Sequence, residues 1–434
     1  TDVQNFFYAL RMPLGFESFV FLEGVDLEHV RRLLESSGHS CADWAEGADV
    51  LGCRCLPMGF SWAPLLAQSV LEHVVKEAGL AGECELVHGC GQVALRRWAT
   101  MCYLDDFTVL VRRASRAAAR HDASQLLDRV KAELQRRGLA SHKDQIGEEI
   151  EALGVVLDCT REGLLLRPAP GKFQAVISAT KEVLRRKSVD GRTLQTIVGH
   201  WAWWLQLRRP LYSVLQEVYP LIVQHGCHGR VVLPPAARRE LRQLIALAPC
   251  VRCRLDLPVS QRVHMVDAGP RMGAVVACRL SERPVHSEDV GLPPRARWQL
   301  AVQRPWLRPA HNNIQEAKTV LWAVERCVRA GERSAICVIY TDSLVVKGAF
   351  DKGRSSSRGL NRMCRRHAAL CAAFGLRVVL RYVASAANWA DGPSRGLRYP
   401  CVAPETCAKA ATKAAARPPP GRPPGLWPGL ADLP

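Results

Sequence analysis

Two adjacent carboxylates, Asp105 and Asp106, lie between two short apolar runs of the chain. Residues 101–103 precede them and residues 107–111 follow, a pattern that predicts a β-hairpin with the acidic pair at its turn. Carboxylates a few ångströms apart repel each other, and a divalent cation between them relieves that repulsion. Aspartate is also an ordinary turn residue, so this stretch alone leaves a plain surface turn equally open.

Asp2 is a third acidic candidate, at the start of another apolar, strand-like stretch. If neighbouring strands of one sheet bring Asp2 beside Asp105 and Asp106, the three carboxylates can hold two divalent ions. One ion would activate an attacking hydroxyl, and the other would stabilise a pyrophosphate leaving group. The chemistry that this set predicts is therefore phosphoryl transfer.

A second acidic set lies in the C-terminal half, where each member stands at the end of a different predicted element. Its members are Asp267, Glu316, Asp342 and Asp391. Taken singly, each is explained by a helix N-cap or a solvated charge. Acidic residues at the ends of separate elements are explained together if they converge on a metal ion.

The elements that must position these residues follow from apolar periodicity. An amphipathic helix is expected over about 115–137, a second hairpin over 153–166, and a helical region over 170–245. Beyond residue 260, strands and then alternating helices and strands predict an α/β domain with a mixed sheet. From about 401 the composition turns to Ala, Pro and Gly, which predicts a disordered tail.

The charge of the chain points to a polyanionic partner. Its 434 residues carry 59 Lys and Arg against 41 Asp and Glu, a net charge of +18 spread over Arg-rich helix faces. Nucleic acid is the partner that such a distribution favours, and an Arg-rich bias of the whole proteome is the alternative. No membrane span or signal peptide is evident, so we expect no membrane partner.

The 17 cysteines form no regular framework and are expected to be small buried hydrophobes in a reducing compartment. Cys53 with Cys55, Cys250 with Cys253, and the His225, Cys227, His228 cluster lack paired zinc-finger spacing. A structural zinc site is the alternative that these groups leave open. We expect an intracellular protein, in the cytoplasm or the nucleus.

Residues 1–160 resemble reverse transcriptases in five places, all in the order of that family. Tyr103-Leu104-Asp105-Asp106 is similar to the Tyr-x-Asp-Asp signature. The other four matches are the first palm motif at residues 2–7, the nucleotide-pocket loop at Leu56–Gly59, Gly138-Leu139 with Lys143, and Leu153-Gly154. The resemblance implies that the fingers, which would precede Asp2, are missing.

The resemblance also implies roles in metal and nucleotide binding. Asp2 and Asp105 would be the principal ligands of Mg²⁺ or Mn²⁺, with Asp106 assisting and the Val3 carbonyl as a backbone ligand. Phe7 would stack under the sugar and exclude a 2′-hydroxyl, unless it is an ordinary core aromatic.

Three further residues would contact the incoming deoxynucleoside triphosphate. Met58 and Gly59 would line its pocket, with Met58 standing where many relatives carry Gln. Lys143 would supply a proton or charge to the leaving phosphate.

Residues 260–396 resemble the ribonuclease H domain of retroelements, which cuts the RNA strand of RNA/DNA hybrids with two Mg²⁺ ions. On this resemblance Asp267, Glu316, Asp342 and Asp391 would be the catalytic metal ligands. The helical middle would be the thumb and connection. Its Trp201, Trp203 and Trp204 suit a nucleic-acid track or, more simply, a helix core.

The expected fold is an α+β polymerase palm with a helical thumb/connection, followed by an α/β ribonuclease H-like domain with a mixed sheet. The expected boundaries are 1–167, 168–258, 259–398 and a tail at 399–434. The expected activity is RNA-directed DNA synthesis from an RNA template and a DNA primer, with ribonuclease H. Direct succession of polymerase and nuclease resembles DIRS-like retrotransposons.

Three alternatives remain to that activity: an inactive retroelement-derived fragment, a non-catalytic nucleic-acid-binding protein, and an RNA-dependent RNA polymerase. Phe7 and the nuclease-like region argue against the last of these. The sequence leaves the oligomeric state open.

Overall fold

A computed structural model describes residues 1–12, 15–16, 20–22, 24–42, 51–80, 97–160, 163–226 and 229–397. The expected disordered tail, Cys227 and His228 lie outside these residues. The chain divides into two compact units, Thr1–Ala152 and the part from Leu153 onward, and each unit is described by itself.

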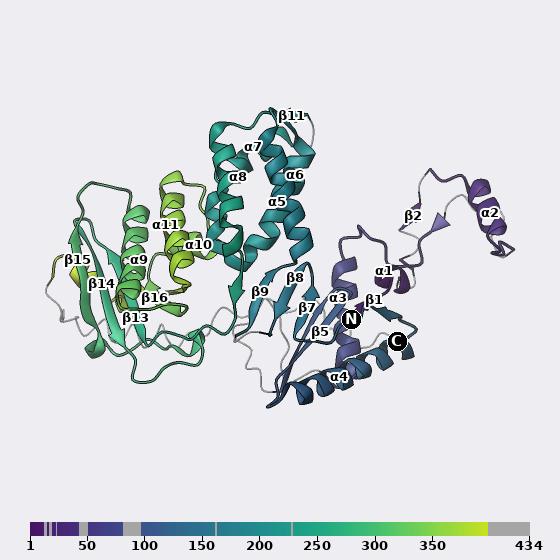
Figure 1. Cartoon of the computed structure of the whole chain (residues 1–434), viewed down its shortest axis with the longest axis horizontal. Helices are drawn as coiled ribbons and strands as arrows, with labels where there is room; N and C mark the ends of the chain where they lie inside the picture. The colour runs from purple at the N-terminus through teal and green to yellow at the C-terminus, as the bar shows by residue number, and fades with distance from the viewer. Residues whose placement is uncertain are drawn as a thin grey trace. The chain divides into compact units, whose positions relative to one another are not determined.

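The first unit is built on a four-stranded sheet in the order β4-β5-β1-β6. The strands are β1 (Asp2–Val3), β4 (Trp98–Tyr103), β5 (Asp106–Val111) and β6 (Ser141–His142). The helices α3 (Ala63–Glu77) and α4 (Arg116–Arg136) pack against one another beside it, as Figure 1 shows. The remaining elements are α1 (Phe6–Ala9), β2 (Phe21–Leu22), α2 (Leu27–Ser36), β3 (Leu51–Gly52) and β7 (Glu149–Ala152).

The predicted acidic hairpin is confirmed, with its turn one residue earlier than expected. Strands β4 and β5 pair antiparallel from Trp98 opposite Val111 to Tyr103 opposite Asp106. The turn is therefore formed by Leu104 and Asp105, and Leu104 adopts a left-handed φ of 54°. Asp106 is the first residue of a strand.

The helix expected at 115–137 is α4, whose inward residues are all buried: Leu126, Leu127, Val130 and Leu134. Helix α3 buries Ala63, Ala67 and Val75, whereas Leu65 is 54% exposed. A period of 3.6 residues allows two adjacent stripes on this apolar helix, and packing against α4 selects between them.

The second unit begins with strands and a bundle of helices. Strand β9 (Leu165–Pro168) lies between β8 (Val155–Asp158) and β12 (Cys253–Arg254). The bundle contains α5 (Pro170–Arg185), α6 (Gly191–Leu205), the 3₁₀ segment η2 (Gln206–Val214), α7 (Val218–His225) and α8 (Pro235–Leu247). A short strand pair, β10 (Val189–Asp190) with β11 (Arg230–Val231), joins its helices at one end. Trp201 and Trp204 are buried in the bundle core, so the simpler prediction for these two tryptophans is confirmed.

The last domain contains a five-stranded sheet in the order β15-β14-β13-β16-β17. Its strands are β13 (Arg262–Ala268), β14 (Met272–Arg279), β15 (Gln299–Pro305), β16 (Ile336–Thr341) and β17 (Arg377–Tyr382). Strands β13, β16 and β17 are parallel, and β14 and β15 are antiparallel to their neighbours. The predicted mixed sheet is confirmed.

Alternation along the central strands buries both faces of this sheet. On β16, Cys337 and Ile339 face the helices, while Val338 and Tyr340 join a second core that includes Trp298. The helices are α9 (Asn312–Arg329), α10 (Leu344–Lys352) and α11 (Arg358–Phe374), and Figure 1 shows α9 lying along the sheet. The chain then forms the short helix α12 (Asp391–Ser394).

The α+β class of the chain is thus observed, while the palm and thumb names remain predictions. No helix among the described residues combines the length and the apolar character that crossing a membrane requires.

Candidate metal sites formed by carboxylates

Three of the four acidic residues of the second set converge. Asp267 lies on β13, Glu316 on α9, and Asp342 directly after β16, and one carboxylate oxygen of each lies within 4.8 Å of the others. Parallel pairing sets this geometry, because His264 on β13 is registered with Ile339 on β16. Asp267 and Asp342 each follow three residues later, at the same end of the sheet.

The surroundings of this cluster disfavour its negative charges. Burial raises the pKa of Glu316 to about 8, and repulsion from Asp267 and Asp342 adds to the effect. Burial likewise raises the pKa of Asp267 to about 6, opposed by a hydrogen bond from Ser394. A bound cation would reverse both shifts by stabilising the ionised carboxylates.

One atom of the cluster lacks the partner that a buried polar group normally has. Glu316 Oε2 is buried and accepts no hydrogen bond from the described residues. Buried carboxylate oxygens are usually paired, so an unpaired oxygen on a carboxylate of this cluster fits a hard divalent ion such as Mg²⁺ or Mn²⁺. The donor set, three carboxylates on three rigid elements, fits the same ions.

Neutral side chains orient the carboxylates of Asp267 and Asp342 by hydrogen bonds. Ser394 Oγ donates to Asp267 Oδ2, and Asn388 Nδ2 donates to Asp267 Oδ1 over 3.2 Å. Ser385 Oγ donates to Asp342 Oδ2 over 2.7 Å. Sequence reasoning missed these three residues, because small polar residues carry no periodic signal and contact partners up to 127 positions away.

Asp391 does not join the other three within the same 4.8 Å spacing. Its Oδ1 forms an ion pair with Arg395 over 2.8 Å, although its charge still raises the pKa of Asp267. Helix α12, which carries it, packs tightly on the β13–β14 turn. A Cβ atom on Gly269 would lie only 2.2 Å from the carbonyl oxygen of Ser394.

Strand pairing brings the residues of the first acidic set, Asp2, Asp105 and Asp106, next to one another. Asp2 on β1 lies directly opposite Asp106 on β5, and the Val3 N–H donates to the Asp105 carbonyl over 2.9 Å. Burial raises the pKa of Asp106, and the charges of Asp105 and Asp2 raise it further. The three residues are therefore neighbours, as the hairpin hypothesis requires.

Their carboxylate oxygens, however, do not reach the spacing of the second set. Among the described residues, only the group of Asp267, Glu316 and Asp342 has that spacing. The Asp2 carboxylate instead pairs with Lys143, whose Nζ lies 2.7 Å from Oδ2. Lys143, which the sequence assigned to the leaving phosphate, thus neutralises an expected metal ligand.

Gln68 on α3 holds the acidic turn and was missed by sequence reasoning. Its Oε1 accepts from the Leu104 N–H over 2.7 Å, and its Nε2 donates to the Cys102 carbonyl over 3.0 Å. The two bonds fix the backbone on both sides of the left-handed residue.

The remaining candidates of the first unit range from half-buried to exposed. Phe7 is half-buried against the core, while its neighbour Phe6 is fully buried. Met58 is 66% exposed, and Gly59 has a φ of 103°, which only glycine adopts readily. Of the expected zinc alternatives, Cys53 and Cys55 approach within 3.5 Å, a pair without a third ligand among the described residues.

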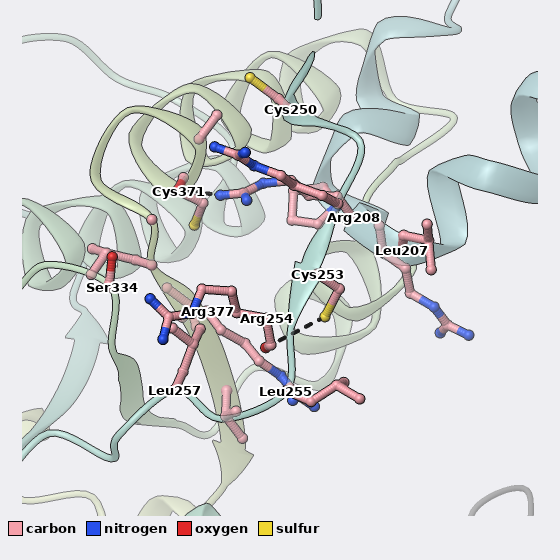
Figure 2. Close-up of a pocket in the computed structure, with 18 of the residues that line it drawn as sticks. Leu207, Arg208, Cys250, Cys253, Arg254, Leu255, Leu257, Ser334, Cys371 and Arg377 are labelled. Carbon is pink, nitrogen blue, oxygen red and sulfur yellow. Dashed lines mark hydrogen bonds between the residues drawn. The ribbon is translucent and has the colours of Figure 1, made fainter. Parts of the chain in front are cut away.

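A separate basic cavity of about 940 Å³ lies between the helical bundle and the start of β17 (Figure 2). Arg208, Arg252 and Arg377 are among its lining residues, with Cys253 and Cys371. Because Arg377 is registered with Ile336 at the start of β16, the cavity and Asp342 lie at opposite ends of the sheet. It is therefore not part of the acidic cluster.

Comparisons with known proteins gave matches among solved structures alone: no family model and no curated protein matches the chain. A foamy viral protease–reverse transcriptase in complex with RNA/DNA hybrid is 13% identical, with a TM-score of 0.41, over 98% of this chain and 46% of that one. Its complex with double-stranded DNA, in a form called dRH, is 12% identical, with a TM-score of 0.37, over 88% and 56%.

Ribonuclease H1 from Halobacterium salinarum NRC-1 is 16% identical, with a TM-score of 0.23, over 30% of this chain and 91% of that one. The present chain spans about half the length of the two foamy viral proteins. The structures that it is similar to thus include reverse transcriptases and a ribonuclease H.

Proposed function

We propose that the chain hydrolyses the RNA strand of RNA/DNA hybrids, as the ribonuclease H part of a retroelement reverse transcriptase of DIRS-like type. The observation that carries the proposal is the convergence of Asp267, Glu316 and Asp342, with a buried Glu316 oxygen left unpaired. The choice of a hybrid as substrate rests on the sequence resemblance and on the net charge of +18.

The three carboxylates of the cluster are oriented to bind divalent ions. Divalent ions bound there would supply a hydroxide-like nucleophile and polarise the scissile phosphate. Asp267 is held at both oxygens by Ser394 and Asn388, and Asp342 is held at Oδ2 by Ser385, so the two carboxylates keep a fixed orientation. Glu316 Oε2 could bind a metal ion without breaking a hydrogen bond, because it accepts none from the described residues.

The test compares the full chain with its Asp342→Asn variant on a labelled RNA/DNA hybrid in the presence of Mg²⁺. We expect cleavage by the parent chain and a loss of at least about a hundredfold in the variant, with hybrid binding retained. Equal cleavage by both proteins contradicts the nuclease proposal. Binding without any cleavage by the parent favours the rival, a non-catalytic nucleic-acid-binding protein.

A second candidate function, RNA-directed DNA synthesis, is supported by the opposition of Asp2 and Asp106 and the adjacent Asp105. With deoxynucleoside triphosphates and a primed RNA template bound, Lys143 would have to break its ion pair with Asp2 and contact the leaving phosphate instead. Phe7 would exclude ribonucleotides.

Asp105→Asn should abolish primer extension in a protein to which a fingers region has been supplied. Extension that is indifferent to this change removes the polymerase function and leaves the nuclease proposal intact.

A further inference from the structure

Trp306 and Trp322 form a stacked pair where the end of β15 meets α9. Their ring centroids are 5.2 Å apart, and their planes are inclined by 25°. Trp306 Nε1 donates to the carbonyl of Gly269 over 2.8 Å. A Cβ atom on Gly273 of β14 would lie 2.6 Å from the Trp306 ring, so the ring rests directly on the sheet backbone. The pair is therefore fixed rather than free to reorient.

Each ring holds one cation. The guanidinium of Arg304 lies 5.7 Å from the Trp322 ring centroid, and the ammonium of Lys318 lies 5.8 Å from that of Trp306. Cation–π contacts restrain long flexible side chains without neutralising their charge. We call Arg304, Trp306, Lys318 and Trp322 the cation platform.

The two cations of the platform have no acidic partner. Within the described part of the chain, neither side chain forms an ion pair or a hydrogen bond. Some other cations of the same domain are paired, as Arg366 is with Glu325 and Arg395 with Asp391, both over 2.8 Å. The platform therefore presents two fixed positive charges that the protein itself does not neutralise.

The cation platform shares its supports with the acidic cluster. Lys318 follows Glu316 by two residues on α9, and Gly269, which anchors Trp306, follows Asp267 by two residues. Lys318 thus shares α9 with Glu316, and Arg304 lies on β15, two residues before the Trp306 that Gly269 anchors. A strand of nucleic acid that reaches the carboxylates would therefore pass the elements that carry both cations.

We propose that the cation platform binds backbone phosphates of the RNA/DNA hybrid next to the acidic cluster, an inference that rests on the proposed nuclease function. Phosphate is favoured over a stacked base because the tryptophan faces are engaged by each other and by the two cations. Arg304 can present two N–H groups to one phosphate, and Lys318 acts as a point charge.

The experiment measures binding of a fluorescent RNA/DNA hybrid to the full chain by anisotropy, in EDTA to prevent cleavage, over a series of salt concentrations. Arg304→Gln and Lys318→Gln should each reduce the slope of log affinity against log salt by about one, because each removes one phosphate contact. At about 0.1 M salt that loss corresponds to a roughly eightfold weaker affinity for each variant. Arg304→Lys should keep the parent slope, which separates the loss of charge from misfolding.

Arg329→Gln is the matched control, because it removes one exposed charge from the same helix, three turns away from Lys318. Its salt slope should stay at the parent value. Unchanged slopes in both platform variants, or an equal loss in Arg329→Gln, would overturn the proposal.

The platform and the nuclease function can be contradicted separately. If the platform variants bind normally while Asp342→Asn abolishes cleavage, the platform is wrong and the nuclease stands. If Asp342→Asn cleaves as the parent chain does, the nuclease is wrong whatever the platform binds.

Discussion

Glu240 and Arg365 form an ion pair over 2.7 Å that joins the helical bundle to the domain of the five-stranded sheet. Glu240 on α8 is buried and also accepts hydrogen bonds from the backbone N–H groups of Gln216, Glu217 and Val218. Arg365 on α11 additionally donates to the carbonyl of Ser213 over 2.9 Å. A single carboxylate thus caps the start of α7 and fixes α11 beside it.

Replacing the Glu240 carboxylate should lower the unfolding free energy more than replacing an exposed carboxylate nearby. Glu240→Ala removes the only carboxylate partner of Arg365 among the described residues and the acceptor of three backbone N–H groups, so we expect a loss of about 3–5 kcal/mol in unfolding free energy. Glu217→Ala, which removes the exposed ion pair with Arg358, should cost less than about 1 kcal/mol. Urea unfolding of the two variants measures the difference, and equal losses would contradict the role of Glu240.

The buried imidazole of His367 should make stability depend on pH. Burial lowers the pKa of His367 to about 4, and the positive charge of Arg208 contributes. Between about pH 6.5 and pH 4 the imidazole of His367 is therefore protonated in the unfolded chain but neutral in the folded chain. Stability falls as pH drops through this range.

At pH 5 this one residue should cost about 2 kcal/mol relative to neutral pH. His367→Gln removes the titrating group, so the stability difference between parent and variant should shrink or reverse at low pH. Parallel pH profiles for the two proteins would show that His367 does not carry the effect.

Divalent ions should stabilise the parent chain through the acidic cluster. With Mg²⁺ at about ten times its dissociation constant, mass action adds about 1.4 kcal/mol to the folded state, a rise of a few °C in melting temperature. Glu316→Gln should abolish most of that rise, and EDTA should reverse it in the parent.

Asp351→Asn is the matched control, since Asp351 is an exposed carboxylate paired with Lys347 in the same domain. It should keep the full Mg²⁺ response. An undiminished response in Glu316→Gln would mean that the ion binds elsewhere.

The acidic turn of the first unit should depend on Gln68. Gln68→Ala removes two hydrogen bonds to the backbone around Leu104, and we expect a loss of about 1–2 kcal/mol. Gln125→Ala, at an exposed position of α4 near His121, should change stability by less than about 0.5 kcal/mol. Differential hydrogen exchange of the Leu104 amide gives a local check, because that amide should lose protection in the first variant alone.

Local pattern was enough to predict the elements that carry the acidic residues. The hairpin around Asp105, the helix of Glu316 and the strand before Asp342 all follow from apolar periods that short-range packing enforces. The convergence of Asp267, Glu316 and Asp342 was predictable only as a hypothesis, because register between β13 and β16 is set by contacts far apart in sequence.

Other parts carried no usable signal. Helix α12 has four residues, one of them Pro393, which is too short to show a helical period. The contacts of Ser394 and Asn388 with Asp267 depend on how that helix packs over Gly269. Likewise, the ion pair of Lys143 with Asp2 depends on the pairing of β1 with β6. The local sequence pattern of these short strands does not predict which strands pair.

Whether the chain cuts RNA within a hybrid can be decided by a single-turnover reaction on a hybrid with different labels on its two strands. We expect Mg²⁺-dependent cleavage of the RNA strand alone by the parent chain, and none by Glu316→Gln although it binds the hybrid equally well. Cleavage of both strands, or RNA cleavage that survives Glu316→Gln, would contradict the nuclease proposal.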